Sequence, residues 1–391
     1  MKPGYKQTDV GVIPEEWEVK HLGDICGRIT TGKLDANKMV ADGDYPFFTC
    51  ARESYRIDKF AFDYEALLVS GNGANVGYVH HYNGKFNAYQ RTYVISDFSA
   101  DVQFLKLFLE RNLHERIRVE VNAGNTPYIT MGTLTEMVVG LPTSREEQRA
   151  IATALSDLDA LLASLERLIA KKRDLKQAAM QQLLTGQTRL PGFKDEWVVK
   201  RLNELADIRS GGTPSTSVAN FWDGNIPWCT PTDITALNGH KYLGETNRKI
   251  TQLGLKASSA EMIYAHSIVM TSRATIGECA INKIPVSTNQ GFKNFVPFET
   301  MDVEFLYYLL LTQKSGFISL CSGSTFLEIG KTQLVAYQVR LPSTKAEQTA
   351  IASVLSEMDA EVTALEQRRD KTRALKQGMM QELLTGRTRL V

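Results

Sequence analysis

A fifty-residue segment occurs twice in this chain, and the repeat constrains the fold more than any other feature. Residues 141–190 and 341–390 align without a gap at an offset of 200, and 27 of their 50 positions are identical. A weaker match relates residues 101–109 to residues 302–310. Because chance does not produce such agreement, the sequence indicates an internal duplication.

Each copy of the repeated segment predicts one long helix. Ser144 and Thr344 each stand three residues before a glutamate, the spacing of a capping box, and Gly186 and Gly386 suit helix C-termini. Between these ends, apolar residues recur at spacings of four and three, which is typical of a coiled-coil seam. The seam residues are Ile151, Leu155, Leu158, Leu162, Leu165 and Ile169 in the first copy and Ile351, Leu355, Met358, Val362 and Leu365 in the second.

The two predicted helices need partners for their apolar seams, and each is the simplest partner for the other. We expect an antiparallel pair related by a pseudo-two-fold axis. A second apolar stripe, formed by Leu161, Leu168 and Leu175, lies off the seam. Contact with the flanking domains is one interpretation of this stripe, and a docking face for another subunit is the other.

The repeat divides the chain into four parts. Residues 191–194, which follow the first helical segment, resemble residues 3–6 near the start of the chain, and this similarity suggests a circular order. Residues 1–140 and 191–340 are variable blocks, and residues 141–190 and 341–391 are the helical segments. Each variable block has short β-branched and aromatic runs broken by Gly, Asn and Pro, with one helix expected at about 101–119 and at 302–315. The predicted class is therefore α+β, with two mixed α/β domains and two long antiparallel helices.

Polar and basic residues gather in the loops of both variable blocks, beside aromatic residues. Asn and Gln side chains can pair with adenine, and Arg and Lys side chains can pair with guanine or bind phosphate. The predicted base contacts are Asn75, Gln90, Asn125, Arg273, Gln290 and Thr325. The predicted phosphate contacts are Lys33, Arg91, Lys293 and Lys331.

Composition and motif spacing exclude several other classes of protein. The net charge of +1 shows no overall basic bias, although it leaves local basic faces possible. The five cysteines form no CxxC pair and the histidines have no metal-ligand spacing, so we expect no metal site and a reducing cytoplasm. The longest apolar run, residues 305–311, is far shorter than the ~20 residues of a membrane span.

No enzyme motif in the chain is complete. Residues 27–33 match the first seven positions of a phosphate-binding P-loop, but Leu34 stands where a hydroxyl is needed for Mg²⁺. The glycines at 71, 73 and 77 do not have dinucleotide-binding spacing, and no methyltransferase motif or nuclease carboxylate cluster is present. We expect no catalysis by this chain alone.

The pattern of two variable blocks, each followed by a helix ending in Leu-Leu-Thr-Gly-x-Thr-Arg-Leu, resembles the specificity subunits of type I restriction–modification systems. Further shared features are the openings around Trp17 and Trp197, the Ser-Arg-Ala-Thr-Ile-Gly run at 272–277, Asn-Gln-Gly-Phe at 289–292, and the Pro-x-x-x-x-Glu-Gln-x-x-Ile-Ala helix starts. The first block departs from the second most clearly at two places. It has Gly-Asn-Gly in place of Ser-Arg-Ala and Tyr-Gln-Arg in place of Asn-Gln-Gly.

The resemblance implies a function in double-stranded DNA recognition. Each variable block would read one half of a split target, and the paired helices would fix the gap between the halves and bind two methyltransferase subunits. Restriction–translocase subunits would join for cleavage. These partner subunits would bind S-adenosylmethionine, ATP and Mg²⁺, and this chain would bind no cofactor. Since the helices are alike and the blocks differ, we expect an asymmetric target.

Two alternatives remain open at the level of sequence. The chain can be a coiled-coil adaptor without DNA affinity, which presents two different protein-binding heads. It can also be an enzyme with a nucleotide site at residues 27–33. Salt-dependent duplex binding separates the first alternative from DNA recognition, and stabilisation by ATP tests the second.

Overall fold

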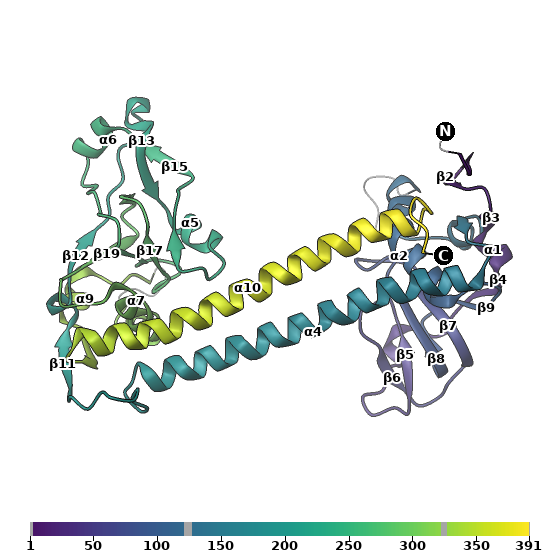
Figure 1. The fold of residues 1–391 in the computed structure, drawn as a ribbon, viewed down its shortest axis with the longest axis horizontal. Coiled ribbons are helices and arrows are strands. Elements are labelled where there is room, and N and C mark those ends of the chain that lie inside the picture. Colours follow the sequence, from purple (N-terminus) through teal and green to yellow (C-terminus); the bar gives the residue numbers. More distant parts are fainter. Residues whose placement is uncertain (1–2, 121–126, 322–326, 391) are drawn as a thin grey trace. The chain divides into compact units, whose positions relative to one another are not determined.

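The computed structural model describes residues 3–120, 127–321 and 327–390, which form two compact units (Figure 1). The first unit combines residues 1–166 with 367–391, and the second consists of residues 167–366. The predicted base contacts Asn125 and Thr325 lie outside the described residues.

Two long helices, α4 (Arg145–Leu183) and α10 (Lys345–Leu383), have 39 residues each and contribute to both units. In the first unit Asp159 pairs with Lys376 at 2.6 Å and Glu166 pairs with Arg373 at 3.1 Å. In the second unit Lys172 pairs with Glu361 at 2.6 Å, and the Lys176 ammonium contacts the Asp359 carboxylate. Residue numbers fall along α10 as they rise along α4, which confirms the predicted antiparallel pairing.

The seam residues are all shielded from solvent to some degree. Ile151 and Leu155 pack into the apolar core of the first unit, and Ile351 and Leu355 pack into that of the second. Leu165 and Ile169 are also buried. Five seam residues are half-buried: Leu158, Leu162, Met358, Val362 and Leu365.

Within the off-seam stripe the exposure differs. Leu161 is half-buried, whereas Leu168 and Leu175 are exposed. Leu375, the counterpart of Leu175 in the second copy, is exposed as well. The stripe as a docking face stays a prediction.

The starts of the long helices differ from the predicted capping boxes. The Glu147 amide meets the Ser144 hydroxyl at 3.5 Å, but the Glu147 carboxylate accepts two bonds from Arg389 rather than one from the cap backbone. Glu347 is engaged in the same way by Arg189. The sequence pattern was therefore right about the position of the helix start and wrong about the reciprocal half of each box.

A six-stranded sheet forms the centre of the first unit. Its strand order is β4-β9-β7-β8-β5-β6. The strands are β4 (Cys26–Thr31), β5 (Tyr45–Phe48), β6 (Tyr55–Ile57), β7 (Phe62–Ser70), β8 (Val79–Ala88) and β9 (Thr92–Phe98). Residues 66–70 of β7 are all buried, because β7 lies between two neighbouring strands and both faces are covered. Leu67 and Val69 pack with residues of α2 (Val102–Glu120), and Ala66 and Leu68 pack in a separate cluster with Phe48 and Phe86.

Smaller elements complete the first unit. They are the hairpin of β1 (Tyr5–Thr8) and β2 (Gly11–Pro14), the pair of β3 (Glu18–His21) and β10 (Val138–Leu141), and the short helices α1 (Leu22–Ile25), η1 (Ala36–Lys38) and α3 (Met131–Thr135). The helix predicted at 101–119 corresponds to α2.

The second unit has a five-stranded sheet in the order β12-β19-β16-β17-β14 and a three-stranded sheet in the order β15-β13-β18. The strands are β12 (Ala206–Ser210), β13 (Trp222–Cys229), β14 (Tyr242–Leu243), β15 (Arg248–Ile250), β16 (Ile268–Thr271), β17 (Cys279–Asn282), β18 (Ser287–Thr288) and β19 (Phe292–Pro297). A separate pair joins β11 (Trp197–Arg201) to β20 (Gln338–Pro342).

The helix predicted at 302–315 is interrupted in the structure. Helix α7 (Val303–Thr312) ends at Gln313, and α8 (Lys314–Ser319) follows directly. The other helices of this unit are η2 (Leu202–Glu204), η3 (Ala219–Phe221), α5 (Pro231–Ala236), α6 (Gln252–Lys256) and α9 (Lys331–Ala336). Six consecutive residues of α7, 305–310, are buried, so its continuous apolar run reflects burial on all sides.

Candidate nucleic-acid interface

Loops at the ends of β4, β5, β7 and β8 meet in the first unit and form what we call the first loop cluster, residues 32–35, 49–52, 71–78, 89–91 and 127–129. The Gly71 amide donates to the Arg91 carbonyl at 2.8 Å, and the Ile129 amide donates to the Gly71 carbonyl at 2.9 Å. The Gln90 amide donates to the Leu34 carbonyl at 2.9 Å. Backbone bonds therefore hold loops from distant parts of the sequence against one another.

The second unit repeats this arrangement in the second loop cluster, residues 211–213, 272–278, 289–291 and 327–331. The Ser272 amide donates to the Gly291 carbonyl at 2.7 Å, and the Ile329 amide donates to the Ser272 carbonyl at 3.1 Å. These bonds correspond in position to those of Gly71 and Ile129 in the first cluster. The duplication thus preserves a loop scaffold although the loop sequences differ.

Each cluster contains a glycine at a point where two backbone segments lie very close together. A Cβ atom on Gly32 would lie 1.8 Å from the Ala88 carbonyl oxygen, and one on Gly211 would lie 1.8 Å from the Asn289 carbonyl oxygen. Residues 27–31, the first part of the P-loop-like stretch 27–33, lie on strand β4. Gly32 therefore serves close packing at a strand end, and this geometry does not favour the nucleotide-site alternative.

The predicted contacts of the first unit lie in the first loop cluster. Lys33, Gln90 and Arg91 are exposed, and Asn75 is half-buried. The Asn75 amide nitrogen donates to the Cys50 carbonyl at 3.0 Å, and the Gln90 amide nitrogen donates to Asp35 Oδ1 at 2.6 Å. Asn75 thus ties two loops together. Its base contact stays a prediction, as do the contacts of the other three residues.

The predicted contacts of the second unit also gather in one place, but they differ in accessibility. Arg273, Gln290 and Lys331 are exposed, and Gln290 accepts a hydrogen bond from the Thr213 hydroxyl. Lys293 is only 6% exposed, and its ammonium lies 3.9 Å from Glu328 Oε1. Burial lowers the pKa of Lys293, while Glu328 acts in the opposite direction. This placement does not favour the predicted phosphate contact of Lys293.

Sequence reasoning missed three charged residues near these loops. Glu328 pairs with Arg273 at 2.9 Å, and Arg52 lies over the Tyr78 ring at 5.9 Å from its centroid. Arg248 stacks on Trp222 with its guanidinium carbon 3.9 Å from the ring centroid. The ring partners of both arginines are distant in the sequence, so local spacing offered no signal for either contact. An acidic residue gives none in a search for DNA contacts.

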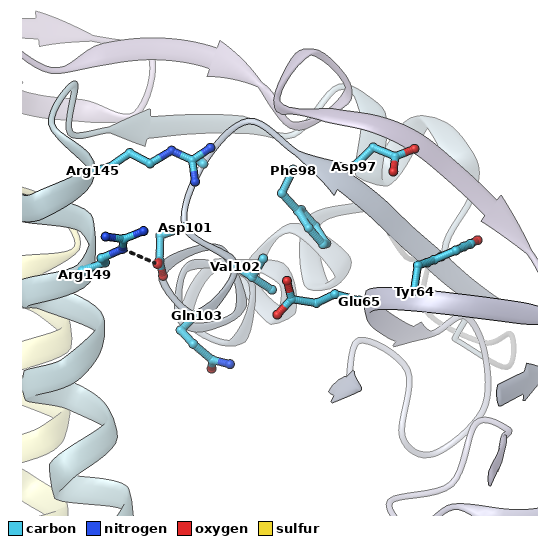
Figure 2. A pocket seen from close by; sticks show the side chains of 10 residues that line it. Tyr64, Glu65, Asp97, Phe98, Asp101, Val102, Gln103, Arg145 and Arg149 are labelled. Carbon is cyan, nitrogen blue, oxygen red and sulfur yellow. Dashed lines mark ion pairs between the residues drawn. The ribbon is translucent and has the colours of Figure 1, made fainter. Parts of the chain in front are cut away.

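A cleft of about 410 Å³ in the first unit provides a different kind of surface (Figure 2). Glu65, Asp97 and Asp101 line it together with Arg145 and Arg149, and Arg149 lies 3.8 Å from Asp101. None of the predicted DNA contacts lines this cleft. The three carboxylates of this cleft disfavour the binding of a DNA phosphate there. Throughout residues 3–120, 127–321 and 327–390, no three His, Cys, Asp or Glu side chains are grouped to hold a metal ion.

The sequence profile of the type I restriction modification DNA specificity domain matches this chain twice, over residues 14–172 and 194–373. Since these matches cover most of the chain, the protein belongs to this family of type I restriction–modification specificity proteins. The predicted family is confirmed, and membership favours DNA recognition over the adaptor alternative. None of the described helices is both long enough and apolar enough to cross a membrane.

Individual relatives agree with this assignment. The MjaIX specificity subunit of Methanocaldococcus jannaschii is 38% identical over 166 residues, 42% of this chain, and the match spans only 38% of that relative. The MjaVIII specificity subunit of the same organism is 25% identical over 97% of this chain and 94% of its own length. A crystal structure of the type I S subunit from M. genitalium has a TM-score of 0.62. It covers 98% of this chain and 99% of its own at 18% identity, a likeness that concerns the fold.

Proposed function

We propose that this chain is the DNA-recognition subunit of a type I restriction–modification complex and that each variable domain reads one half of an asymmetric, bipartite target. The observation that carries the proposal is the pair of matched loop clusters. Equivalent backbone bonds hold the loops in both units, whereas the side chains presented there differ. A common scaffold with divergent readers is expected of a protein that recognises two different half-sites.

The paired helices would act as a spacer between the half-sites. At a rise of ~1.5 Å per residue, the 39 residues of α4 extend over about 58 Å. The ion pairs between α4 and α10 occur within each unit, so each variable domain is associated with a paired stretch of helix. The length of that pair would set the number of base pairs between the two half-sites.

Two methyltransferase subunits are the proposed partners of the repeated helices. The exposed leucines at equivalent positions, Leu175 and Leu375, support one shared contact in each copy, whereas Leu161 and Leu168 correspond to the charged residues Glu361 and Arg368. S-adenosylmethionine would be bound by these partners, and ATP and Mg²⁺ by the restriction–translocase subunits. The cysteines are all free, in agreement with a cytoplasmic complex.

A salt titration of duplex binding tests DNA recognition. The chain, purified with the partner that accompanies it from its host, is mixed with target and non-target duplexes between 50 and 200 mM salt. DNA recognition predicts affinity that falls steeply with salt and a preference for the target of at least ~10³-fold. A complex that binds no duplex at low salt would support the adaptor alternative.

A further inference from the structure

Arg273 and Glu328 of the second loop cluster form a compact group of charges with Lys293 of the adjoining strand β19. Glu328 Oε2 lies 2.9 Å from Arg273 Nε, and Glu328 Oε1 lies 3.9 Å from Lys293 Nζ. The Arg273 side chain is 47% exposed, whereas that of Lys293 is 7% exposed. One carboxylate thus lies between a buried cation and a cation that faces solvent.

Glu328 is held in this position from two directions. Its backbone forms an antiparallel bridge with that of Arg273, next to the bond from the Ile329 amide to the Ser272 carbonyl. The Lys293 ammonium also needs a nearby counter-charge, since a buried charge without a partner is strongly destabilising. Lys293 therefore attracts the Glu328 carboxylate toward the inner side of the loop, where it also contacts Arg273.

The loop that carries Arg273 is itself ordered by several hydrogen bonds. The Thr271 hydroxyl donates to the Thr275 carbonyl at 2.5 Å, and the Gly277 amide donates to the Thr271 carbonyl at 2.9 Å. Ala274 adopts φ +57°, a left-handed conformation that is uncommon for a residue with a side chain. Such strain at an exposed loop is typical of a functional site.

The chemistry of the guanidinium indicates what this arrangement recognises. The ion pair occupies Nε, and the two terminal nitrogens carry the pair of donors that a bidentate contact to guanine O6 and N7 requires. We propose that Glu328 is a positioning residue that orients Arg273 to read one guanine in the half-site of the second domain. This inference rests on the proposed DNA-recognition function.

A phosphate is a poorer ligand for the same arginine. The phosphate oxygens would carry negative charge next to the Glu328 carboxylate, and like charges at close range disfavour each other. The major-groove edge of guanine presents neutral acceptors and meets no such repulsion. A carboxylate beside the arginine therefore favours a base contact over a backbone contact.

The first domain lacks this group of charges. Asn72, Tyr93 and Tyr128 occupy the positions that correspond to Arg273, Lys293 and Glu328, and Asn72 forms the same backbone bridge to Tyr128 that Arg273 forms to Glu328. The Tyr93 hydroxyl donates to the Ile129 carbonyl at 2.9 Å, so the corresponding loop connection is neutral. The guanine contact is thus expected in the second half-site alone.

Base substitution by 7-deazaguanine, which lacks N7, tests the inference directly. Each guanine of the mapped target is replaced in turn, and the Kd is measured for the chain in complex with its methyltransferase partner. We expect one guanine of one half-site at which replacement weakens wild-type binding about fivefold or more. Arg273→Ala removes this penalty, because the variant has no side-chain donor for guanine N7. Glu328→Gln reduces the penalty at the same guanine and leaves those at other positions unchanged.

Asp207→Asn provides the matched control, since Asp207 pairs with Arg209 Nε at 2.7 Å outside the second loop cluster. This variant should retain the wild-type penalties at every guanine. A purely structural role of Glu328 would weaken all duplexes alike and leave the penalty intact, which would overturn the inference. A penalty that persists in Arg273→Ala, or no penalised guanine in the wild type, would overturn it as well. Failure of the wild type to prefer its target would instead refute the proposed function itself.

Discussion

Arg389 makes two hydrogen bonds to Glu147, from Nε to Oε1 and from Nη2 to Oε2, both at 2.8 Å. Arg189 holds Glu347 in the same way, at 2.6 and 2.7 Å. Each bond joins the segment after one long helix to the start of the other long helix. The two glutamates are almost fully buried. These pairs give the circular order of the repeat a physical basis within each unit.

Replacement of Glu147 by Gln should lower the free energy of unfolding of the first unit by about 1.5–3 kcal/mol, because charge-assisted bonds are lost and the Arg389 guanidinium stays partly buried. The loss is measured as a lower urea midpoint. Glu347→Gln should cost at least as much, since Glu347 also accepts a bond from Trp197 Nε1 at 3.2 Å. Trp17 Nε1 has no such partner in the described part of the chain. Unchanged midpoints for both variants would contradict this role of the arginine pairs.

Alanine at Gly32 or Gly211 should destabilise the corresponding unit strongly, because the new Cβ would overlap a backbone carbonyl oxygen. Gly378→Ala is the matched control. Gly378 lies within α10 with no other atom within 4 Å of an added Cβ, so this change should raise stability by about 1 kcal/mol. Thermal unfolding of the three variants measures both effects. Equal stability of Gly32→Ala and the wild type would contradict the close approach of the two backbones at this strand end.

Glu304 should make the stability of the second unit depend on pH. Burial raises its pKa, but bonds from Ser356, Tyr242 and Lys241 outweigh this effect, so the pKa is lowered overall. A lowered carboxyl pKa contributes stability that is fully present above the unfolded value of about 4.3 and is lost as the pH falls through the folded value.

The difference in unfolding midpoint between the wild type and Glu304→Gln should therefore be largest near neutral pH and shrink as the medium becomes acidic. Glu278→Gln serves as a control in the same unit, because the pair of Glu278 with Lys314 is well exposed and should contribute about 0–1 kcal/mol. A difference that grows toward acidic pH would contradict the lowered pKa of Glu304.

The spacer proposal predicts a change in target when the helices are lengthened. Seven residues inserted after Glu166 and seven after Glu366 keep the heptad register and leave the ion pairs within each unit intact. The added rise is about 10 Å, which corresponds to about 3 base pairs. Methylation mapping should show the same half-sites with a longer gap. A gap of unchanged length would refute the role of the helices as a spacer.

The sequence predicted the fold best where the burial of regularly spaced apolar residues determines the structure. The spacing of Ile151, Leu155 and the other seam residues predicted the long helices, because two buried stripes of this length require a partner. Among the β-branched and aromatic runs of the first block, residues 66–70 lie on β7 and residues 93–96 lie on β9.

The same patterns could not show which polar groups are buried or paired. Lys293 reads as an exposed cation in the sequence, yet it lies on a strand whose residues 292–295 are all buried. Glu147 reads as a capping residue, but its partner Arg389 is 242 positions away. Partners so distant in sequence are set by tertiary packing, which local spacing does not record.

The most direct measurement of the central claim is a map of adenine methylation across the host genome with and without this gene. The account predicts that deletion abolishes methylation at one split, asymmetric motif and leaves all other motifs unchanged. Deletion that leaves every motif methylated, or that removes a palindromic motif, would contradict recognition of an asymmetric bipartite target by the two variable domains.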